Sequence, residues 1–193
     1  ANSLAIVDAV QEAQVPNISL AAAAQIIEPV DERYWVFKTP QTDRLMINGI
    51  VEDMVANGLT TVAFLGIDDA YGEGGLVELQ AAVEGTGIEI VTTERYGRND
   101  TSVTAQALNV VARRPDAALI WGVVRDTALV VEALDDRGYQ GMVYVSHGVG
   151  NPSFLELAGD AAEGVRLPIG PMIVVDEMDD ANPIKAVARA YVD

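Results

Sequence analysis

A tyrosine in the segment GIDDAYGEGG, residues 66–75, is the side chain that most clearly suggests chemistry with a small molecule. Tyr71 stands between the apolar run TVAFL and a segment with helical spacing, so we expect it at a strand-to-helix turn. Such a turn needs Gly and Asp for its backbone but does not need an aromatic ring. Tyr71 is therefore a candidate ligand-facing ring; the alternative is a tyrosine that packs sideways with its hydroxyl in water. We expect Asp68 and Asp69 to be turn and N-cap residues, not metal ligands.

Two polar side chains follow later apolar runs. His147, the only histidine, lies in SHGVGN, where its ring could face a cleft. Arg125 follows GVV, where a guanidinium could bind a carboxylate through two parallel hydrogen bonds. The alternatives are a loop histidine with a satisfied hydrogen bond and a surface arginine paired with Asp126 or Glu132.

No combination of residues predicts catalysis. The nucleophile motif Gly-x-Ser-x-Gly is absent, and no pair of carboxylates stands out as acid and base. DDAYGEGG fits neither the dinucleotide fingerprint nor a P-loop. The lack of cysteine excludes a thiol nucleophile, a disulfide and Cys-ligated zinc. We expect a binding protein without catalytic residues, cofactor or metal.

Composition excludes other partners. The 193 residues include 29 acidic and 12 basic side chains, for a formal net charge of -17, and no basic cluster offsets the excess. Such a chain repels nucleic acid, so we expect no nucleic-acid partner. No apolar stretch is long enough to span a bilayer, and no leader stands at the start, so we expect any export signal to have been removed or never present.

The elements that must position these side chains alternate strand and helix. The runs VAFL, IEIV and AALI are nearly continuous in apolar residues, as in strands of a parallel sheet buried on both faces. The pattern predicts an α/β fold, a doubly wound parallel sheet with helices on both faces. The expected strands are 60–66, 88–93, 117–122 and 142–146, and the expected helices are 42–57, 71–84, 102–114, 126–136 and 152–158.

The flanking regions have less regular patterns. A helix is expected over 3–14 and short strands over 15–20 and 34–39, while a Pro-rich passage precedes a last helix that starts near residue 182. Both ends of the chain have helical spacing, so we expect them to continue into a longer chain. Segments 38–41 and 167–171 have the composition of linkers. The predicted domains are 1–37, part of a first lobe; 38–166, a complete second lobe; and 167–193, a return segment into the first.

In open α/β sheets, ligands bind at the carboxyl ends of the strands, near a reversal of strand order. The segments expected there are SLAAAAQ, DDAYGEG, GVVRDT and SHGVGN. They contain Tyr71, Arg125 and His147, so we expect these side chains to line one edge.

Several segments, taken in order, resemble a known family. They are SLAIVDAVQEAQ with VPNIS, YWVFKTPQTD, VAFLGIDDAYGEG, GIEIVTTERY, PDAALIWG, GNPSFLELAGDAAEGV and the Pro-rich passage. The chain resembles, over nearly its whole length, the periplasmic substrate-binding proteins of branched-chain amino acid ABC transporters, the leucine/isoleucine/valine-binding type. The resemblance implies a type I periplasmic binding fold, with two α/β lobes joined by three crossovers that close on ligand like a hinge. This chain would supply one complete lobe and part of the other.

The resemblance also implies roles in the complete lobe. Tyr71 occupies the place of a tyrosine that covers the ligand. His147 stands where amino-acid binders carry an acidic residue that holds the ligand's ammonium group. A second tyrosine of the family is replaced by Val123 or Val124.

In the partial lobe, the family binds the ligand carboxylate with small and hydroxyl residues. The chain offers Asn2 and Ser3 before its first helix. In SLAAAA, Ala21 and Ala22 match the family, but Ala23 stands where a threonine is expected.

These departures disfavour an α-amino acid, because a buried ammonium without a partner costs several kcal/mol. They favour an organic acid, aromatic acids included, or an amide, with polar groups bound by His147 and Arg125 and an apolar side against Val123, Val124 and Tyr71. The resemblance implies a periplasmic solute-binding protein, exported and either free or lipid-anchored, that delivers a small molecule to an ABC permease. The alternative is a ligand-sensing domain of a receptor or of an amide-responsive regulator.

Overall fold

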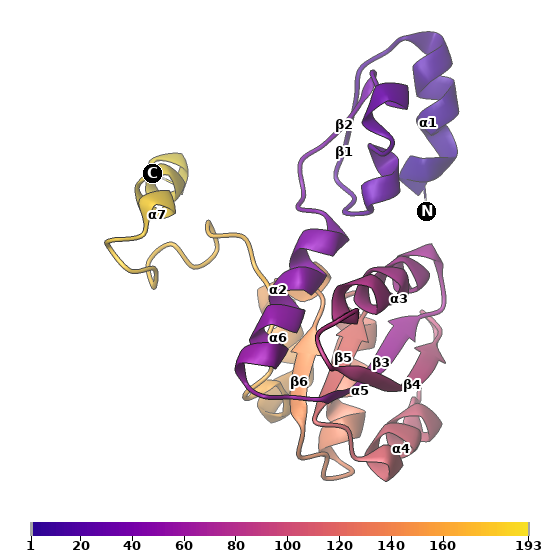
Figure 1. The fold of residues 1–193 in the computed structure, drawn as a ribbon, viewed down its shortest axis with the longest axis vertical. Coiled ribbons are helices and arrows are strands. Elements are labelled where there is room, and N and C mark those ends of the chain that lie inside the picture. Colours follow the sequence, from indigo (N-terminus) through magenta and orange to yellow (C-terminus); the bar gives the residue numbers. More distant parts are fainter. Residues whose placement is uncertain (1, 193) are drawn as a thin grey trace.

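The computed structural model describes residues 2–192 of the chain, and Ala1 and Asp193 lie outside the described residues. It contains three parts: a small N-terminal unit, an α/β lobe, and a C-terminal segment that leads away from the lobe (Figure 1). The order of elements along the chain follows the predicted alternation of strands and helices.

The N-terminal unit is built around two short parallel strands. β1 (Asn17–Ser19) pairs with β2 (Val36–Lys38), and both are shorter than the sequence predicted. Helix α1 (Asn2–Ala13) packs beside them, and 3₁₀ turns occupy Ala24–Ile26 and Val30–Glu32. The buried cluster described in this unit is small, consisting of Val7, Ile26 and Val36, and Ala24 is also buried.

The lobe contains a four-stranded, fully parallel sheet. Its strands are β3 (Thr61–Ile67), β4 (Glu89–Tyr96), β5 (Ala117–Trp121) and β6 (Met142–Val145), in the spatial order β4-β3-β5-β6. The chain moves outward from β3 to β4 and then returns to the other side of β3 to form β5. The direction of strand order therefore reverses between β3 and β5.

Helices cover both faces of this sheet. Alternate residues of β3 point to opposite faces, so Val62 and Phe64 join one buried cluster while Ala63 and Leu65 join the other. The first face is covered by α2 (Asp43–Ala56) and α3 (Ala70–Val83). The second is covered by α4 (Thr104–Arg113), α5 (Val124–Asp135) and α6 (Pro152–Ala158). This arrangement confirms the predicted doubly wound α/β class.

One expectation about the strands was wrong. β3 and β5 are buried along nearly their whole length, but β4, which begins at the second residue of IEIV, has mostly half-buried and exposed residues. β4 pairs only with β3 and so lies at an edge of the sheet. The composition of IEIV could not reveal this, because the number of neighbours of a strand depends on the order of strands.

The C-terminal segment first runs beside β6 and then leaves the lobe. The backbone of Arg166 donates to Val143 and accepts from Val145, each at 2.9 Å. Residues 167–182 contain no helix or strand and lead to α7 (Pro183–Val192), which Figure 1 shows apart from the sheet. Across residues 2–192, none of the helices is long and apolar enough to cross a bilayer.

Candidate functional site

Two aromatic rings meet where the strand order reverses. Tyr71 is the second residue of α3, directly after β3, and Trp121 is the last residue of β5. Their ring centroids are 5.8 Å apart, with an interplanar angle of 40°. The chain goes from β3 to one side of the sheet and from β5 to the other. The carboxyl ends of β3 and β5 therefore lie at the position where open α/β sheets bind ligands.

Asp69 fixes the position of Tyr71. Its Oδ1 accepts hydrogen bonds from the backbone amides of Tyr71 at 2.8 Å and Gly72 at 3.3 Å, which confirms its prediction as the N-cap. Its Oδ2 accepts from Arg98 Nε at 3.0 Å. Asp69 thus caps the first turn of α3 and also connects it to the loop after β4.

The glycines of YGEGG allow α3 to approach the sheet closely. A Cβ at Gly75 would lie 2.3 Å from Cδ1 of Trp121, and a Cβ at Gly72 would lie 1.9 Å from the carbonyl oxygen of Ile67. Both distances are too short for any larger residue. The glycines around Tyr71 therefore make room for Trp121 and for the end of β3.

His147 lies beside the same indole. It begins a 3₁₀ turn, His147–Val149, after β6, and its ring centroid is 5.8 Å from that of Trp121. Burial, assisted by the charge of Lys38, lowers the pKa of His147 to about 4. The imidazole is therefore neutral at neutral pH and can offer one hydrogen-bond donor and one acceptor.

The structure adds a carboxylate that the sequence interpretation missed. Asp43, the first residue of α2, is only 3% exposed, and its Oδ1 lies 3.8 Å from Nε2 of His147. That distance is too long for a hydrogen bond. Burial raises the pKa of Asp43 to about 6, with Lys38 opposing the rise and Glu78 adding to it. In TPQTDR this residue has the appearance of an ordinary helix-start aspartate, so no local signal marks it.

Three adjoining side chains have buried polar atoms without a partner. These atoms are Oδ1 of Asp43, Nδ1 of His147 and Nε1 of Trp121. Buried polar groups in native proteins are nearly always hydrogen-bonded, so each such atom needs an explanation. Nε1 of Trp121 lies under α3, 2.6 Å from where a Cβ at Gly75 would be, and the Trp121 side chain is fully buried. Oδ1 of Asp43 and Nδ1 of His147 therefore indicate the place that a polar ligand or ordered water completes.

Neighbouring groups hold this edge together. Ser146 is fully buried, and its Oγ donates to the carbonyl oxygen of Gly122 at 2.7 Å, which links the ends of β6 and β5. A Cβ at Gly148 would lie 3.1 Å from the hydroxyl of Tyr71, so this hydroxyl lies beside the turn that carries His147. Burial raises the pKa of Tyr71, so its phenol stays protonated at neutral pH.

The segment GVVRDT lies at the same edge. Val123 is the N-cap of α5, which begins at Val124, two residues earlier than predicted. Val123 and Val124 are half-buried, and Val124 packs against the core under α4 and α5. Arg125 is exposed, and among residues 2–192 it forms no ion pair with Asp126 or Glu132.

The N-terminal unit contributes a separate polar group. Oγ of Ser19 donates to Oγ of Ser3 at 2.9 Å and accepts from the backbone amide of Ala21 at 3.1 Å. Ser19, the last residue of β1, is 5% exposed. The sequence interpretation named the alanines of SLAAAA but not this serine, although it is the first residue of that stretch.

The remaining predicted residues lie close to this pair of serines in the chain. Ala21, Ala22 and Ala23 are half-buried and follow β1. Asn2 begins α1, but its side chain lies outside what the structure describes. Within the described residues, no hydrogen bond joins this group to Asp43, Trp121 or His147.

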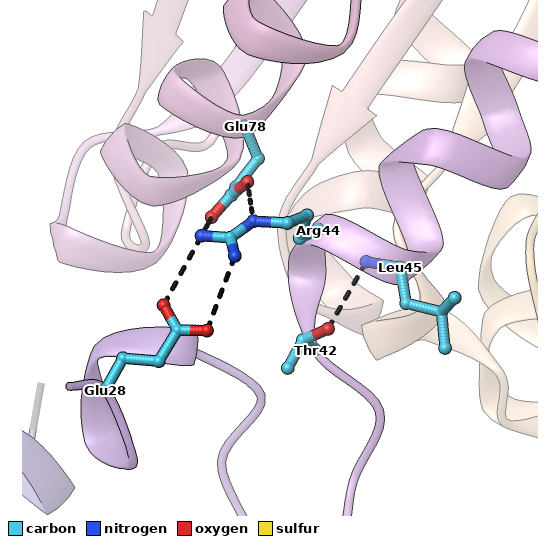
Figure 2. Close-up of polar contacts among 5 residues, drawn as sticks. All are labelled: Glu28, Thr42, Arg44, Leu45 and Glu78. Carbon is cyan, nitrogen blue, oxygen red and sulfur yellow. Dashed lines mark hydrogen bonds and ion pairs between the residues drawn. The ribbon is translucent and has the colours of Figure 1, made fainter. Parts of the chain in front are cut away.

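An arginine connects the N-terminal unit to the lobe. Arg44, on the first turn of α2, pairs with Glu78 of α3 at 3.1 Å and with Glu28 of the N-terminal unit at 3.4 Å (Figure 2). Thr42 caps the same helix, since its Oγ1 accepts from the amide of Leu45 at 3.3 Å. The beginning of α2 therefore holds both the carboxylate of the site and the bridge between the units.

Two other features do not belong to this edge. A hollow of about 660 Å³ on the N-terminal unit is lined mainly by apolar side chains, including Val30, Tyr34 and Phe37, and contains none of the predicted binding residues. In the part of the chain that the structure describes, no group of three or more His, Cys, Asp or Glu side chains could hold a metal ion.

The sequence pattern of one family covers the chain. The family described as "Periplasmic binding protein" matches residues 1–193. The chain belongs to the periplasmic binding protein family. This membership and the fold confirm the resemblance found in the sequence. The family is one of binding proteins and not of enzymes.

Solved structures match the chain closely. Two extracellular ligand-binding receptors from Rhodopseudomonas palustris share 38% and 36% identity, with TM-scores of 0.88 and 0.90, over 98% and 99% of this chain. The matched regions cover 52% and 53% of those proteins, so the chain spans about half their length. The comparison with curated proteins finds no match.

More distant structures share the fold. A branched-chain amino acid ABC transporter protein from Thermus thermophilus with bound valine has 20% identity and a TM-score of 0.79, over 84% of this chain and 43% of that one. A leucine-binding protein from Thermotoga maritima has 22% identity and a TM-score of 0.74, over 84% and 46%. At these identities the likeness concerns the fold alone.

Proposed function

We propose that this chain is part of a solute-binding protein of an ABC importer, which captures a small carboxylic acid between two lobes and delivers it to a membrane permease. The amino acids and the organic or aromatic acids are the candidate ligands. The protein would act in the periplasm. Family membership supports the general class of function, and the carboxyl edge of the sheet supports a ligand site.

The observation that carries the proposal is the half-buried ring of Tyr71 at the reversal of strand order, packed on the fully buried Trp121, with the unpartnered Oδ1 of Asp43 and Nδ1 of His147 at the same edge. Small-molecule sites combine apolar and aromatic walls with a few convergent polar groups, and this edge has both. Ser3 and Ser19 of the N-terminal unit would contact the carboxylate from the other side.

The mechanism that we infer is capture by closure. A ligand that contacts both units favours the closed arrangement by its additional contact free energy, and the permease recognises that arrangement. Segments 38–41 and 167–171 would bend, and Arg125, exposed at the start of α5, would attract an anionic ligand.

A receptor is the second candidate. The matched Rhodopseudomonas palustris structures are described as extracellular ligand-binding receptors, and the same fold can serve a sensor. An importer gene should lie beside permease genes, whereas a sensor gene should encode an output domain or be adjacent to one.

Calorimetric titration of the full-length protein with amino acids, aliphatic acids and aromatic acids tests the proposal. At least one of these acids should bind, and Tyr71→Ala should weaken its binding by about tenfold or more, because an aromatic wall of the site is lost. Val77→Ala, an exposed position on the same helix, should leave binding unchanged. The proposal fails if no acid binds or if Tyr71→Ala binds as tightly as wild type.

A further inference from the structure

We propose that Asp43 is a specificity-determining residue whose carboxylate accepts a hydrogen bond from a donor group, an ammonium or a hydroxyl, of the ligand that binds beside Tyr71 and His147. This inference rests on the proposed function and deepens it, since it specifies what one end of the ligand must carry. It also changes the ligand class that the sequence alone favoured.

The placement of Asp43 supports this role. It begins α2 directly after the segment that leaves the N-terminal unit, and the next residue, Arg44, pairs with Glu28 of that unit and with Glu78 of the lobe, so Asp43 lies where the two units join. The residue is 3% exposed, and its Oδ1 is buried without a hydrogen-bond partner. A buried carboxylate oxygen without a partner is costly to the folded state, so a ligand that donates to it recovers free energy.

Asp43 supplies the acidic group that the family resemblance expects at the position of His147. His147 stands where the family resemblance expects an acidic residue, but Asp43 brings a carboxylate to 3.8 Å from its Nε2. The acidic group reaches this place from α2, not from the turn after β6. A missing acidic residue in SHGVGN therefore does not mean that the site lacks a negative charge.

His147 and Asp43 together select the chemistry of the ligand group. A hydroxyl can donate to Asp43 and accept from the imidazole N–H, and an ammonium can donate to both Asp43 and the free imidazole nitrogen. A second carboxylate would instead meet Asp43 with like charge. The ligand carboxylate should therefore lie toward Ser3 and Ser19, with the donor group toward Asp43.

Two series of acids with matched carbon skeletons test the inference. The first is leucine, its α-hydroxy analogue leucic acid, and isocaproic acid, which lacks either group; the second is phenylalanine, phenyllactic acid and hydrocinnamic acid. Titration of the full-length protein should show that the amino or the hydroxy acid of at least one series binds about tenfold or more tightly than the unsubstituted acid. Comparison of the amino and hydroxy members identifies which donor the site takes.

The variant Asp43→Asn should abolish this preference, so that the substituted and unsubstituted acids bind about equally. Glu52→Gln is the matched control, because it removes a carboxylate from an exposed position of the same helix and should leave the preference intact. The ratio of affinities is the decisive readout, since mere damage to α2 would weaken all ligands together.

A second measurement needs no variant. In wild type, the preference for the amino acid over the unsubstituted acid should decline as the pH falls from about 7.5 to about 5, because Asp43 becomes protonated there. His147, Lys38 and Glu78 also face this carboxylate, and His147 stays neutral across that range.

The outcomes separate the inference from the proposed function. If an acid binds but the unsubstituted member binds as tightly, or if Asp43→Asn keeps the preference, the role of Asp43 is overturned and the solute-binding function stands. If none of the six acids binds, the small-acid function is overturned, and the inference falls with it.

Discussion

Asp43 and His147 are adjacent groups on which burial has opposite effects. Burial raises the pKa of Asp43 from 3.8 to about 6 and lowers that of His147 from 6.5 to about 4. As pH rises from about 4 to 6, the folded state keeps the Asp43 proton longer than the unfolded chain does, so this residue lowers stability. Over nearly the same range the unfolded chain keeps the His147 proton longer, so this residue raises stability. The two effects largely cancel in wild type.

Single substitutions should separate these opposite contributions. Relative to wild type, the free energy of unfolding of Asp43→Asn should increase by roughly 3 kcal/mol between pH 4 and 6, because the variant lacks the carboxyl group whose ionisation destabilises the folded state over that range. That of His147→Gln should decrease by a similar amount between pH 4 and 6.5. Urea unfolding at a series of pH values measures both. Curves parallel to wild type would show that neither group is desolvated as described.

At the scale of elements, the start of α2 is where contacts from distant parts of the chain converge. Arg44 lies between a buried carboxylate on α3, Glu78 at 8% side-chain exposure, and the half-exposed Glu28 of the N-terminal unit (Figure 2). Loss of the arginine would leave the Glu78 carboxylate buried without its partner, which costs more than the loss of an exposed pair. The pair with Glu28 is longer and faces solvent, so it contributes little.

A double-mutant cycle measures this asymmetry. Arg44→Gln should reduce the free energy of unfolding by about 1–2 kcal/mol, less than for a wholly buried pair because solvent screens the half-exposed guanidinium. Adding Glu78→Gln should recover part of that loss. Glu28→Gln is the control, with an expected change below about 0.5 kcal/mol. A double variant less stable than Arg44→Gln would contradict the role of Glu78.

At the scale of the whole molecule, the hydrophobic cores are unequally distributed. Both large clusters of buried residues belong to the α/β lobe, one on each face of its sheet. The N-terminal unit has a core of only three clustered residues, and many of its apolar side chains are exposed, among them Ile18, Leu20 and Phe37. The lobe therefore has the burial that independent folding requires, and the N-terminal unit does not.

A polypeptide of residues 39–171 should consequently fold without the rest of the chain. Thermal unfolding followed by circular dichroism should show one cooperative transition, while residues 1–38 alone should show none. This experiment also tests the predicted division of the chain near residues 38 and 167, which stays a prediction. Cooperative unfolding of the short piece, or its absence in the long one, would refute the division.

The sequence was sufficient for the fold class and for much of the local structure. Apolar periodicity located each strand and helix of the lobe to within a few residues, and Asp69 was recognised as a cap, because these features depend on hydrogen bonds and burial close in the chain. The positions of Tyr71 and His147 after β3 and β6 followed from the same pattern. Their roles in ligand binding stay predictions.

The sequence by itself determined the alternation of elements, the family, and which segments follow the strands. Only the tertiary structure decided that β4 is an edge strand, that Trp121 and His147 pack together, and that Asp43 supplies the carboxylate beside them. The physical reason is the separation along the chain of the residues that come into contact. Periodicity records contacts within one element, whereas these side chains come from α2, β5 and the turn after β6, and meet only through the order in which a parallel sheet is assembled.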